Sequence, residues 1–350
     1  MNTQITRKPL CLAAGLLFCL GTGTSAIAQV DSTTCRLAPA LVTQVKQPEA
    51  FDRIARLLHS GAYSSVAASQ GLSREALPTR NAVAMGLAHA KTYSFASADF
   101  PGAGSSDVFD ENSSMIVGTT TFSSNELAFT LKGSTYQLLT LPGAQASVAT
   151  AINTGGQIVG IYADATDATH GFLFNSGVLV NIDDPDAAVG QTDVLDINDG
   201  GEIVGFYQDN ASVVHGFLTN DDGVSFSNID FPGATSTQAV GVNSAGEIVG
   251  TWTDASSKTH GFSLMSGVFT TFDFPLAVST TAFSINDNGE IAGSFSDATT
   301  DHGFVYSNGQ FTQIDVSGAS SVELTRIKNN GRITGIYIDS TNEVHGLTGR

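Results

Sequence analysis

Short runs of alternating apolar and polar residues fill most of the chain, and they recur with a long period. The phrase Ile-Val-Gly occurs four times and then twice more as Ile-Ala-Gly and Ile-Thr-Gly. Its final residues, which lie 42, 45, 45, 43 and 42 residues apart, are Gly118, Gly160, Gly205, Gly250, Gly293 and Gly335. Alternation with a period of two is typical of β-strands, and a period of this length indicates a repeat protein.

Each repeat contains four strand-like runs separated by turn residues. In the third repeat these runs are residues 193–197, 202–207, 215–219 and 225–231. The first two are joined by Asn198-Asp199-Gly200-Gly201, a hairpin turn in which glycine supplies the positive φ that such turns need. Four strands within 42 to 45 residues is the size of one propeller blade. We therefore predict an all-β fold, a six-bladed β-propeller of four-stranded blades.

The repeat is offset along the chain, so that the two ends of the propeller share one blade. The first three runs occur six times, but the fourth run follows them only five times. Its sixth copy lies at the start, because residues 95–103 (Phe-Ala-Ser-Ala-Asp-Phe-Pro-Gly-Ala) match residues 226–234 (Phe-Ser-Asn-Ile-Asp-Phe-Pro-Gly-Ala). We expect the propeller to span residues 93–350, with a strand over 95–100 closing the last blade. Such closure removes the open sheet edges that promote aggregation.

The first 28 residues have the pattern of an export signal. Arg7 and Lys8 precede an apolar stretch over residues 10–20, and Ala26-Ile27-Ala28 provides the small residues that signal peptidase requires. We expect a signal peptide over residues 1–28, cleavage near Ala28, and a secreted or periplasmic location.

Residues 29–92 form a second region, in which the patterning is helical. Phe51, Ile54 and Leu57 lie on one stripe of a helix that Gly61 would end. We expect a short helical N-terminal segment that packs on the propeller as a cap or serves as a tether.

Charge and cysteine content limit the partners of the protein. The formal net charge is −18, and loss of Arg7 and Lys8 with the signal takes it to −20. An acidic surface repels nucleic acid and anionic membranes, and no later apolar segment is long enough to span a bilayer. Cys35 is the only cysteine left after cleavage, so an intramolecular disulfide is excluded. We expect a monomer without a nucleic-acid partner, a membrane span or a cofactor.

Histidines and aspartates recur together in the repeat. Five histidines precede a glycine at one position: His170, His215, His260, His302 and His345. An aspartate stands five or six residues before each of them: Asp164, Asp209, Asp254, Asp297 and Asp339. Such groups serve in metal binding and acid–base catalysis, but we favour structural pairs across one turn. The reason is that the first repeat lacks both partners and has Phe122 and Leu127 in their places. No metal site and no catalytic residue is predicted here.

Four charged residues depart from the repeat near the predicted channel. In a gap-free alignment on the Ile-Val-Gly phrase, Glu111 and Lys328 stand where the other repeats have Asn153, Asn198, Asn243 and Asn286. Those asparagines are expected to bond the backbone of their own hairpin turns. Arg326 and Asp196 occupy a position that is otherwise Ala151, Gly241 or Ser284. The candidate ligand-binding residues are therefore Glu111, Asp196, Arg326 and Lys328. We favour an electrostatic role for them, in which Glu111 and Lys328 form an ion pair across the seam where the first and last blades meet.

Another set of aspartates ends the fourth run of the repeat. Its members are Asp99, Asp183, Asp230, Asp273 and Asp315. We interpret them as turn formers. The most acidic of these turns, Asp183-Asp184-Pro185-Asp186, is the best candidate for a cation site.

The repeat resembles a known family in two segments. Residues 243–250 (Asn-Ser-Ala-Gly-Glu-Ile-Val-Gly) and 259–262 (Thr-His-Gly-Phe) resemble the bacterial extracellular HAF repeat, named for a His-Ala-Phe tripeptide that stands here as His-Gly-Phe. The resemblance covers about residues 94–350. It implies an exported repeat protein and brings no catalytic residues.

Two classes of function fit this sequence. We favour a non-catalytic binding module for a glycan or protein partner, because the repeats are nearly symmetric. They also lack the serine-hydrolase elbow, His-Glu-x-x-His, P-loop and dinucleotide motifs. The alternative is a secreted polysaccharide hydrolase or lyase with its site at the channel mouth. In that case Asp196, Arg326 and Lys328 would be expected to line one pocket.

Overall fold

The computed structural model describes residues 100–103, 105–122, 125–219, 223–297, 299–341 and 344–349. These residues form six antiparallel sheets, and no helix occurs among them. The first three sheets consist of β1 (Ser105–Glu111), β2 (Ile116–Phe122), β3 (Asn125–Lys132) and β4 (Thr135–Leu138); β5 (Ala146–Ile152), β6 (Ile158–Ala163), β7 (Thr169–Asn175) and β8 (Val178–Ile182); and β9 (Thr192–Ile197), β10 (Ile203–Gln208), β11 (Val214–Thr219) and β12 (Phe226–Ile229). The last three consist of β13 (Ser236–Val242), β14 (Ile248–Thr253), β15 (Thr259–Met265) and β16 (Val268–Phe272); β17 (Ser279–Ile285), β18 (Ile291–Ser296), β19 (Asp301–Ser307) and β20 (Gln310–Ile314); and β21 (Ala319–Ile327), β22 (Ile333–Asp339) and β23 (Val344–Gly349).

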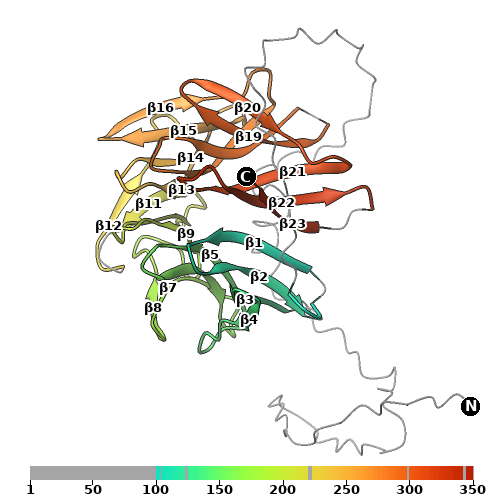
Figure 1. Ribbon diagram of the computed structural model, residues 1–350. Coiled ribbons are helices and arrows are strands. Elements are labelled where there is room, and N and C mark those ends of the chain that lie inside the picture. Colours follow the sequence, from blue (N-terminus) through green and yellow to red (C-terminus); the bar gives the residue numbers. More distant parts are fainter. Residues whose placement is uncertain are drawn as a thin grey trace, which may run out of the picture. The chain divides into compact units, whose positions relative to one another are not determined.

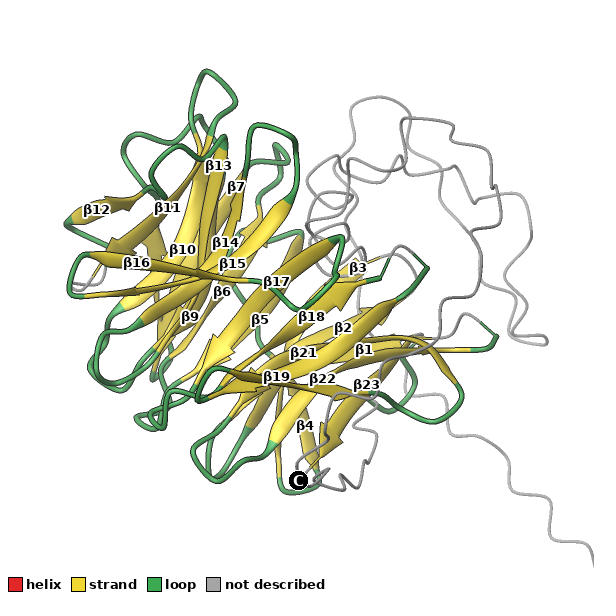
Figure 2. Ribbon diagram, turned by 90° about the horizontal axis from the view of Figure 1, so that it is seen from above, coloured by secondary structure: helices red, strands yellow, loops and turns green. Residues whose placement is uncertain are grey.

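The six sheets are the blades of a propeller. Strands that follow each other in sequence pair with each other in every sheet. The first strand of each blade contacts the first strand of the next, from β1 through β5, β9, β13 and β17 to β21. The ring closes where β1 contacts β21, β22 and β23, which lie side by side in Figures 1 and 2. The predicted six-bladed β-propeller with four-stranded blades is confirmed.

The sixth blade has three strands among the described residues, β21, β22 and β23. The strand predicted to complete it spans residues 95–100, of which only Phe100 is among the described residues. The rest of this strand, the predicted signal peptide over 1–28 and the predicted helical segment over 29–92 lie outside them.

The glycine of the Ile-Val-Gly phrase is required by a bulge in the inner strand of each blade. The register of β9 against β10 shifts after Val204, and the corresponding shift occurs in the other five blades. The bulge brings the carbonyl oxygen of Asp193 toward Gly205, so that a Cβ atom there would lie far inside van der Waals contact. The same clash with an inner-strand carbonyl is found at the glycine of every repeat.

The phenylalanine of the His-Gly-Phe phrase is buried in the core of four blades. Phe172, Phe217, Phe262 and Phe304 are completely buried, and the corresponding position holds Phe129 in the first blade and Leu347 in the sixth, which are buried as well. The Phe217 ring lies over Gly205, where a Cβ would be 2.8 Å from its Cζ. The hydrophobic core is thus divided into layers between neighbouring blades, one of which joins Val204 to Ile229, Val242 and Phe262.

Candidate functional site

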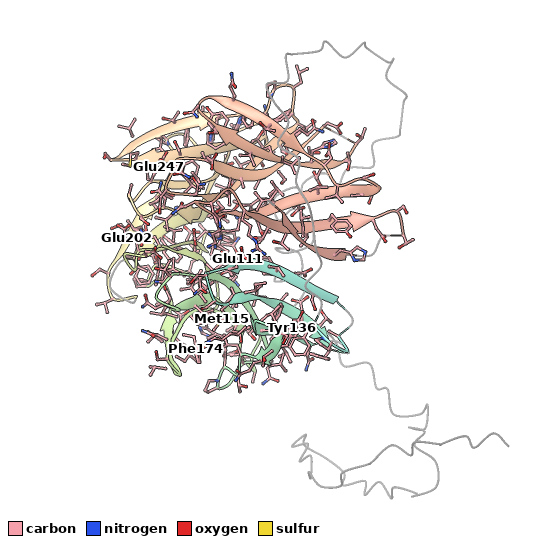
Figure 3. The ribbon with its side chains drawn as sticks, viewed as in Figure 1. Glu111, Met115, Tyr136, Phe174, Glu202 and Glu247 are labelled. Atoms are coloured by element: carbon pink, nitrogen blue, oxygen red, sulfur yellow. The ribbon has the colours of Figure 1, made fainter. Side chains whose placement is uncertain are left out.

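The turns between the first two strands of the blades surround one cavity of about 500 Å³, which we call the mouth cavity. All six blades contribute to it. The lining residues are 110–113, 152–154, 196–199, 242–244, 285–287, 326–330 and 332. The enzymatic alternative requires Asp196, Arg326 and Lys328 to converge, and all three line this cavity. Glu111, which is labelled in Figure 3, lines it as well.

Five asparagines and Lys328, one residue from each blade, form a ring in the wall of the mouth cavity. Each asparagine side chain donates through Nδ2 to the backbone oxygen of the equivalent residue in the next blade. The series runs Asn112 to Asn153 (3.0 Å), Asn153 to Asn198 (3.2 Å), Asn198 to Asn243 (2.9 Å), Asn243 to Asn286 (3.3 Å) and Asn286 to Lys328 (3.1 Å). The predicted hydrogen bonds between each asparagine side chain and the backbone of its own turn are confirmed, for example at Asn198, whose Oδ1 accepts from Gly200 N and Glu202 N. These asparagines therefore link neighbouring blades, and most of their amide donors and acceptors are already used in hydrogen bonds within the protein.

Asn112, and not Glu111, completes this ring in the first blade. The first turn is one residue shorter than the others, because Asn112 N bonds Met115 O where Asn153 N bonds Gln157 O. The gap-free alignment on Ile-Val-Gly was therefore wrong by one residue in this blade. Glu111 pairs with Ile116 across the hairpin, so it replaces an apolar residue such as Ile152 or Ile197.

The same correction places Asp110 at the position of Asp196 and Arg326, which the sequence alignment missed. Asp110 and Asp196 make equivalent bonds. Asp110 accepts from Glu111 N (2.7 Å) and from Ile152 N of the next blade (2.9 Å), and Asp196 accepts from Ile197 N (2.8 Å) and Val242 N (2.9 Å). Both carboxylates are almost fully buried.

Arg326 crosses the floor of the mouth cavity and holds these two carboxylates. Its Nη1 lies 2.7 Å from Asp196 Oδ2, its Nε 3.3 Å from Asp110 Oδ1, and its Nη2 donates to Thr150 O at 3.4 Å. One side chain of the sixth blade therefore contacts the first, second and third blades. Burial by itself would lower the pKa of Arg326, but the charges of Asp110 and Asp196 outweigh it and raise the pKa. Burial raises the pKa of Asp196, as does Asp110, and Arg326 opposes this.

Three more charged groups form the seam cluster, which we define as Glu111, Lys328 and Arg332. The expected pair between Glu111 and Lys328 is replaced by two others. Lys328 Nζ lies 2.6 Å from Asp110 Oδ1, and Arg332 Nε lies 2.8 Å from Glu111 Oε1. Burial raises the pKa of Glu111, although the Arg332 and Lys328 charges work against this. Arg332, which the sequence reasoning missed, lies four residues after Lys328 on the same turn.

The Asp–His residues lie on other turns, where the second and third strands of a blade meet. Each imidazole Nε2 faces the preceding aspartate: His170–Asp164 (3.6 Å), His215–Asp209 (3.7 Å), His260–Asp254 (3.5 Å), His302–Asp297 (3.5 Å) and His345–Asp339 (3.4 Å). The other oxygen of each carboxylate accepts from its own turn; Asp254 Oδ1, for example, accepts from Ser256 N, Ser256 Oγ and Lys258 N. These bonds lower the pKa of Asp254 to about 2.

The aspartates that end the fourth strands bond the other side of the same imidazoles. Nδ1 lies close to a carboxylate in four blades: His170–Asp183 (3.0 Å), His215–Asp230 (2.8 Å), His260–Asp273 (2.8 Å) and His302–Asp315 (2.8 Å). Interpreting these aspartates only as turn formers missed this contact. Each ring also stacks on an aromatic side chain, as His260 does on Trp252 at 4.4 Å between centroids. In the first blade, Phe122 instead packs edge-on against Phe100.

Cation binding at the acidic turn 183–186 finds no support in this geometry. Asp183 is engaged by His170, while Asp184 is buried and accepts from Asp186 N. Burial raises the pKa of Asp184. Across the part of the chain that the structure describes, no three His, Cys, Asp or Glu side chains converge in a way that could hold a metal ion.

Among the same residues there is also no helix that is long and apolar enough to cross a membrane.

Comparison with known proteins finds no family for this chain and only remote structural similarities. No family model matches the chain, and no curated protein matches it. The chain is similar to virginiamycin B lyase from Staphylococcus aureus, with 11% identity over 73% of this chain and 88% of the lyase and a TM-score of 0.44. It is also similar to a six-bladed propeller lectin from Aleuria aurantia (10% identity, 70% and 91% coverage, TM-score 0.45) and to AofleA from Arthrobotrys oligospora (12%, 74% and 86%, TM-score 0.48). These values are too low to carry information on a ligand or an activity.

Proposed function

We propose that the protein is an exported, non-catalytic binding module that takes the end of a glycan, or a segment of a partner protein, into the mouth cavity. One observation supports this above all others. Six charged residues that depart from the repeat line this cavity: Asp110, Glu111, Asp196, Arg326, Lys328 and Arg332. Arg326, Asp110 and Asp196 pair with one another in the floor, whereas Lys328 and Arg332 are partly exposed in the cavity, whose volume lies within the usual range of ligand sites. The resemblance to the exported HAF repeats agrees with this proposal.

The test is a glycan array probed with the purified protein and with a Lys328→Gln variant. We expect the protein to bind a restricted set of glycans and the variant to lose this binding while its thermal unfolding remains cooperative. Lys258→Gln is the matched control, because Lys258 lies on the turn between β14 and β15 and does not line the cavity. Equal binding by all three proteins would place the site elsewhere and overturn the proposal.

A second candidate is a polysaccharide hydrolase or lyase that uses the same cavity. It is favoured by the raised pKa of Glu111, because a carboxyl that keeps its proton to higher pH can serve as a general acid. A substrate screen that measures new reducing ends and unsaturated products would detect this activity. Cleavage that is abolished by Glu111→Gln would rank this function above simple binding.

A further inference from the structure

Basic side chains are scarce in this protein, and they are concentrated at the mouth cavity. Five lysines and arginines occur among the described residues: Lys132, Lys258, Arg326, Lys328 and Arg332. Three of the five line the cavity. Arg326 is buried and faces Asp110, Asp196 and Thr150, so it belongs to the floor. Lys328 and Arg332 remain as cations that a ligand can reach, with side chains 29% and 39% exposed.

Arg332 is held in a fixed orientation with its outer nitrogens uncommitted. Its Nε donates to Thr348 Oγ1 (3.1 Å) and lies 2.8 Å from Glu111 Oε1. These two contacts come from the sixth and the first blade and restrict the orientation of the guanidinium. Neither Nη1 nor Nη2 is bonded to any acceptor within the described residues. A guanidinium fixed in this way is prepared for a planar, two-oxygen acceptor, because its parallel N–H groups match the spacing of carboxylate oxygens.

The groups beside Arg332 suit hydroxyls rather than a second anionic charge. Lys328 uses one of its three N–H groups on Asp110, and Glu111 uses Oε1 on Arg332, which leaves Oε2 as an acceptor. The inner charges balance, with Asp110, Glu111 and Asp196 against Arg326, Lys328 and Arg332. Asp199 and Asp287 line the rim and add negative charge. A doubly charged phosphate would be repelled there, whereas a single carboxylate can be accommodated.

We infer that the mouth cavity recognises a sugar that carries one carboxylate, such as a uronic acid at the end of an acidic polysaccharide. Arg332 binds the carboxylate through its outer nitrogens, and Lys328 and Glu111 bind neighbouring hydroxyls. The inference rests on the proposed binding function and names its ligand class.

Isothermal titration with matched monosaccharides tests this assignment. The purified protein is titrated with galacturonate and glucuronate, with galactose and glucose as neutral counterparts, and with glucose 6-phosphate as the dianion. We expect at least one uronate to bind about 10-fold or more tightly than its neutral counterpart and than the phosphate. Arg332→Gln should weaken that binding about 10-fold to 100-fold, since it removes charged hydrogen bonds. Lys258→Gln should leave the binding unchanged.

The possible results separate this inference from the function on which it rests. If neutral sugars bind as tightly as uronates, or if Arg332→Gln binds uronates normally, the cavity binds glycans and the carboxylate assignment is wrong. If neither the sugars nor the glycan array gives binding, the proposed function itself fails. Lys328→Gln is the second variant, in case Arg332→Gln does not give a cooperative thermal transition.

Discussion

At the scale of the residue, one glycine in each repeat sets how closely two strands can approach. The inner strand bulges toward the second strand at the Ile-Val-Gly phrase, and the carbonyl of Asp193 occupies the space that a Cβ on Gly205 would need. The Phe217 ring fills the remaining volume. The glycine is therefore a packing requirement, and its recurrence in all six repeats reflects the same bulge in all six blades.

Gly205→Ala is accordingly expected to destabilise the propeller by about 3 kcal/mol, the upper part of the usual range for overpacking a tight core. The measurement is urea unfolding followed by tryptophan fluorescence, since Trp252 is the only tryptophan. Gly200→Ala is the control, because the nearest atom to its new Cβ would be Asn198 Oδ1 at 3.2 Å, on an exposed turn. Similar losses in both variants would contradict this account of the bulge.

At the scale of the element, the imidazole between two carboxylates fastens the outer part of a blade. In the fifth blade His302 joins the turn after β18, through Asp297, to the end of β20, through Asp315. Gln313 Nε2 also contacts its Nδ1 at 3.1 Å, and the ring stacks on Phe295. Burial lowers the pKa of His302, but Asp315 and Asp297 outweigh this effect, so the pKa is raised above 6.5. The charged imidazole is the form that the blade favours.

This raised pKa predicts a pH-dependent stability contribution. A group whose pKa is raised on folding stabilises the fold fully below its unfolded pKa, and the contribution is lost as the pH rises through the folded pKa. The stability difference between the protein and a His302→Gln variant should therefore be larger at about pH 5 than at about pH 9. Urea unfolding at both pH values measures it. A difference that is equal at the two values, or larger at about pH 9, would show that His302 contributes only as a neutral partner.

The sequence predicted repeated elements well and contacts between elements poorly. Alternation and turn glycines were sufficient for the strands, the first hairpins and the asparagine bonds within a turn, because these depend on residues close in sequence. The bond from Asp315 to His302 joins two strands through their lateral packing, which no local pattern encodes. Asp110 was missed for a simpler reason: the turn Asn112-Ser113-Ser114-Met115 is one residue short, and comparing each asparagine-to-isoleucine spacing would have revealed it.

At the scale of the whole molecule, the ring is closed by contacts between its ends. Thr325 and Thr334 of the sixth blade donate to the backbone oxygen of Phe109 at 3.4 and 3.5 Å. The seam cluster and Arg326 add ion pairs between the same two blades. The sequence placed the charge exceptions at this seam but assigned the wrong partners, since the partners depend on how inner strands face each other across the channel.

The sequence also predicts that the strand over residues 95–100 contributes to closure from the outer side. Deleting residues 94–99, which leaves Phe100 in place, should lower the thermal unfolding temperature by several degrees, because β23 would lose its predicted partner strand. Deleting residues 30–90 serves as the control and should leave the unfolding temperature nearly unchanged. Differential scanning calorimetry measures both, and an unchanged transition after the first deletion would refute this mode of closure.

Arg326 should contribute most of the electrostatic closure, because it joins the sixth blade to both Asp110 and Asp196 across the channel floor, whereas Lys328 pairs with Asp110. Arg326→Met would leave Asp196 buried without a cation, and we expect a loss of about 3–5 kcal/mol in urea unfolding at about pH 7. Without the guanidinium the pKa of Asp196 should rise further, so the loss should shrink at about pH 4, where the carboxyl can take up a proton. The double variant Arg326→Met, Asp196→Asn should recover part of the stability, because it removes the unpaired charge and keeps an acceptor for Val242 N. If the double variant were no more stable than Arg326→Met, the arginine would act through packing alone, and the charge exceptions at the seam would be free to serve a ligand.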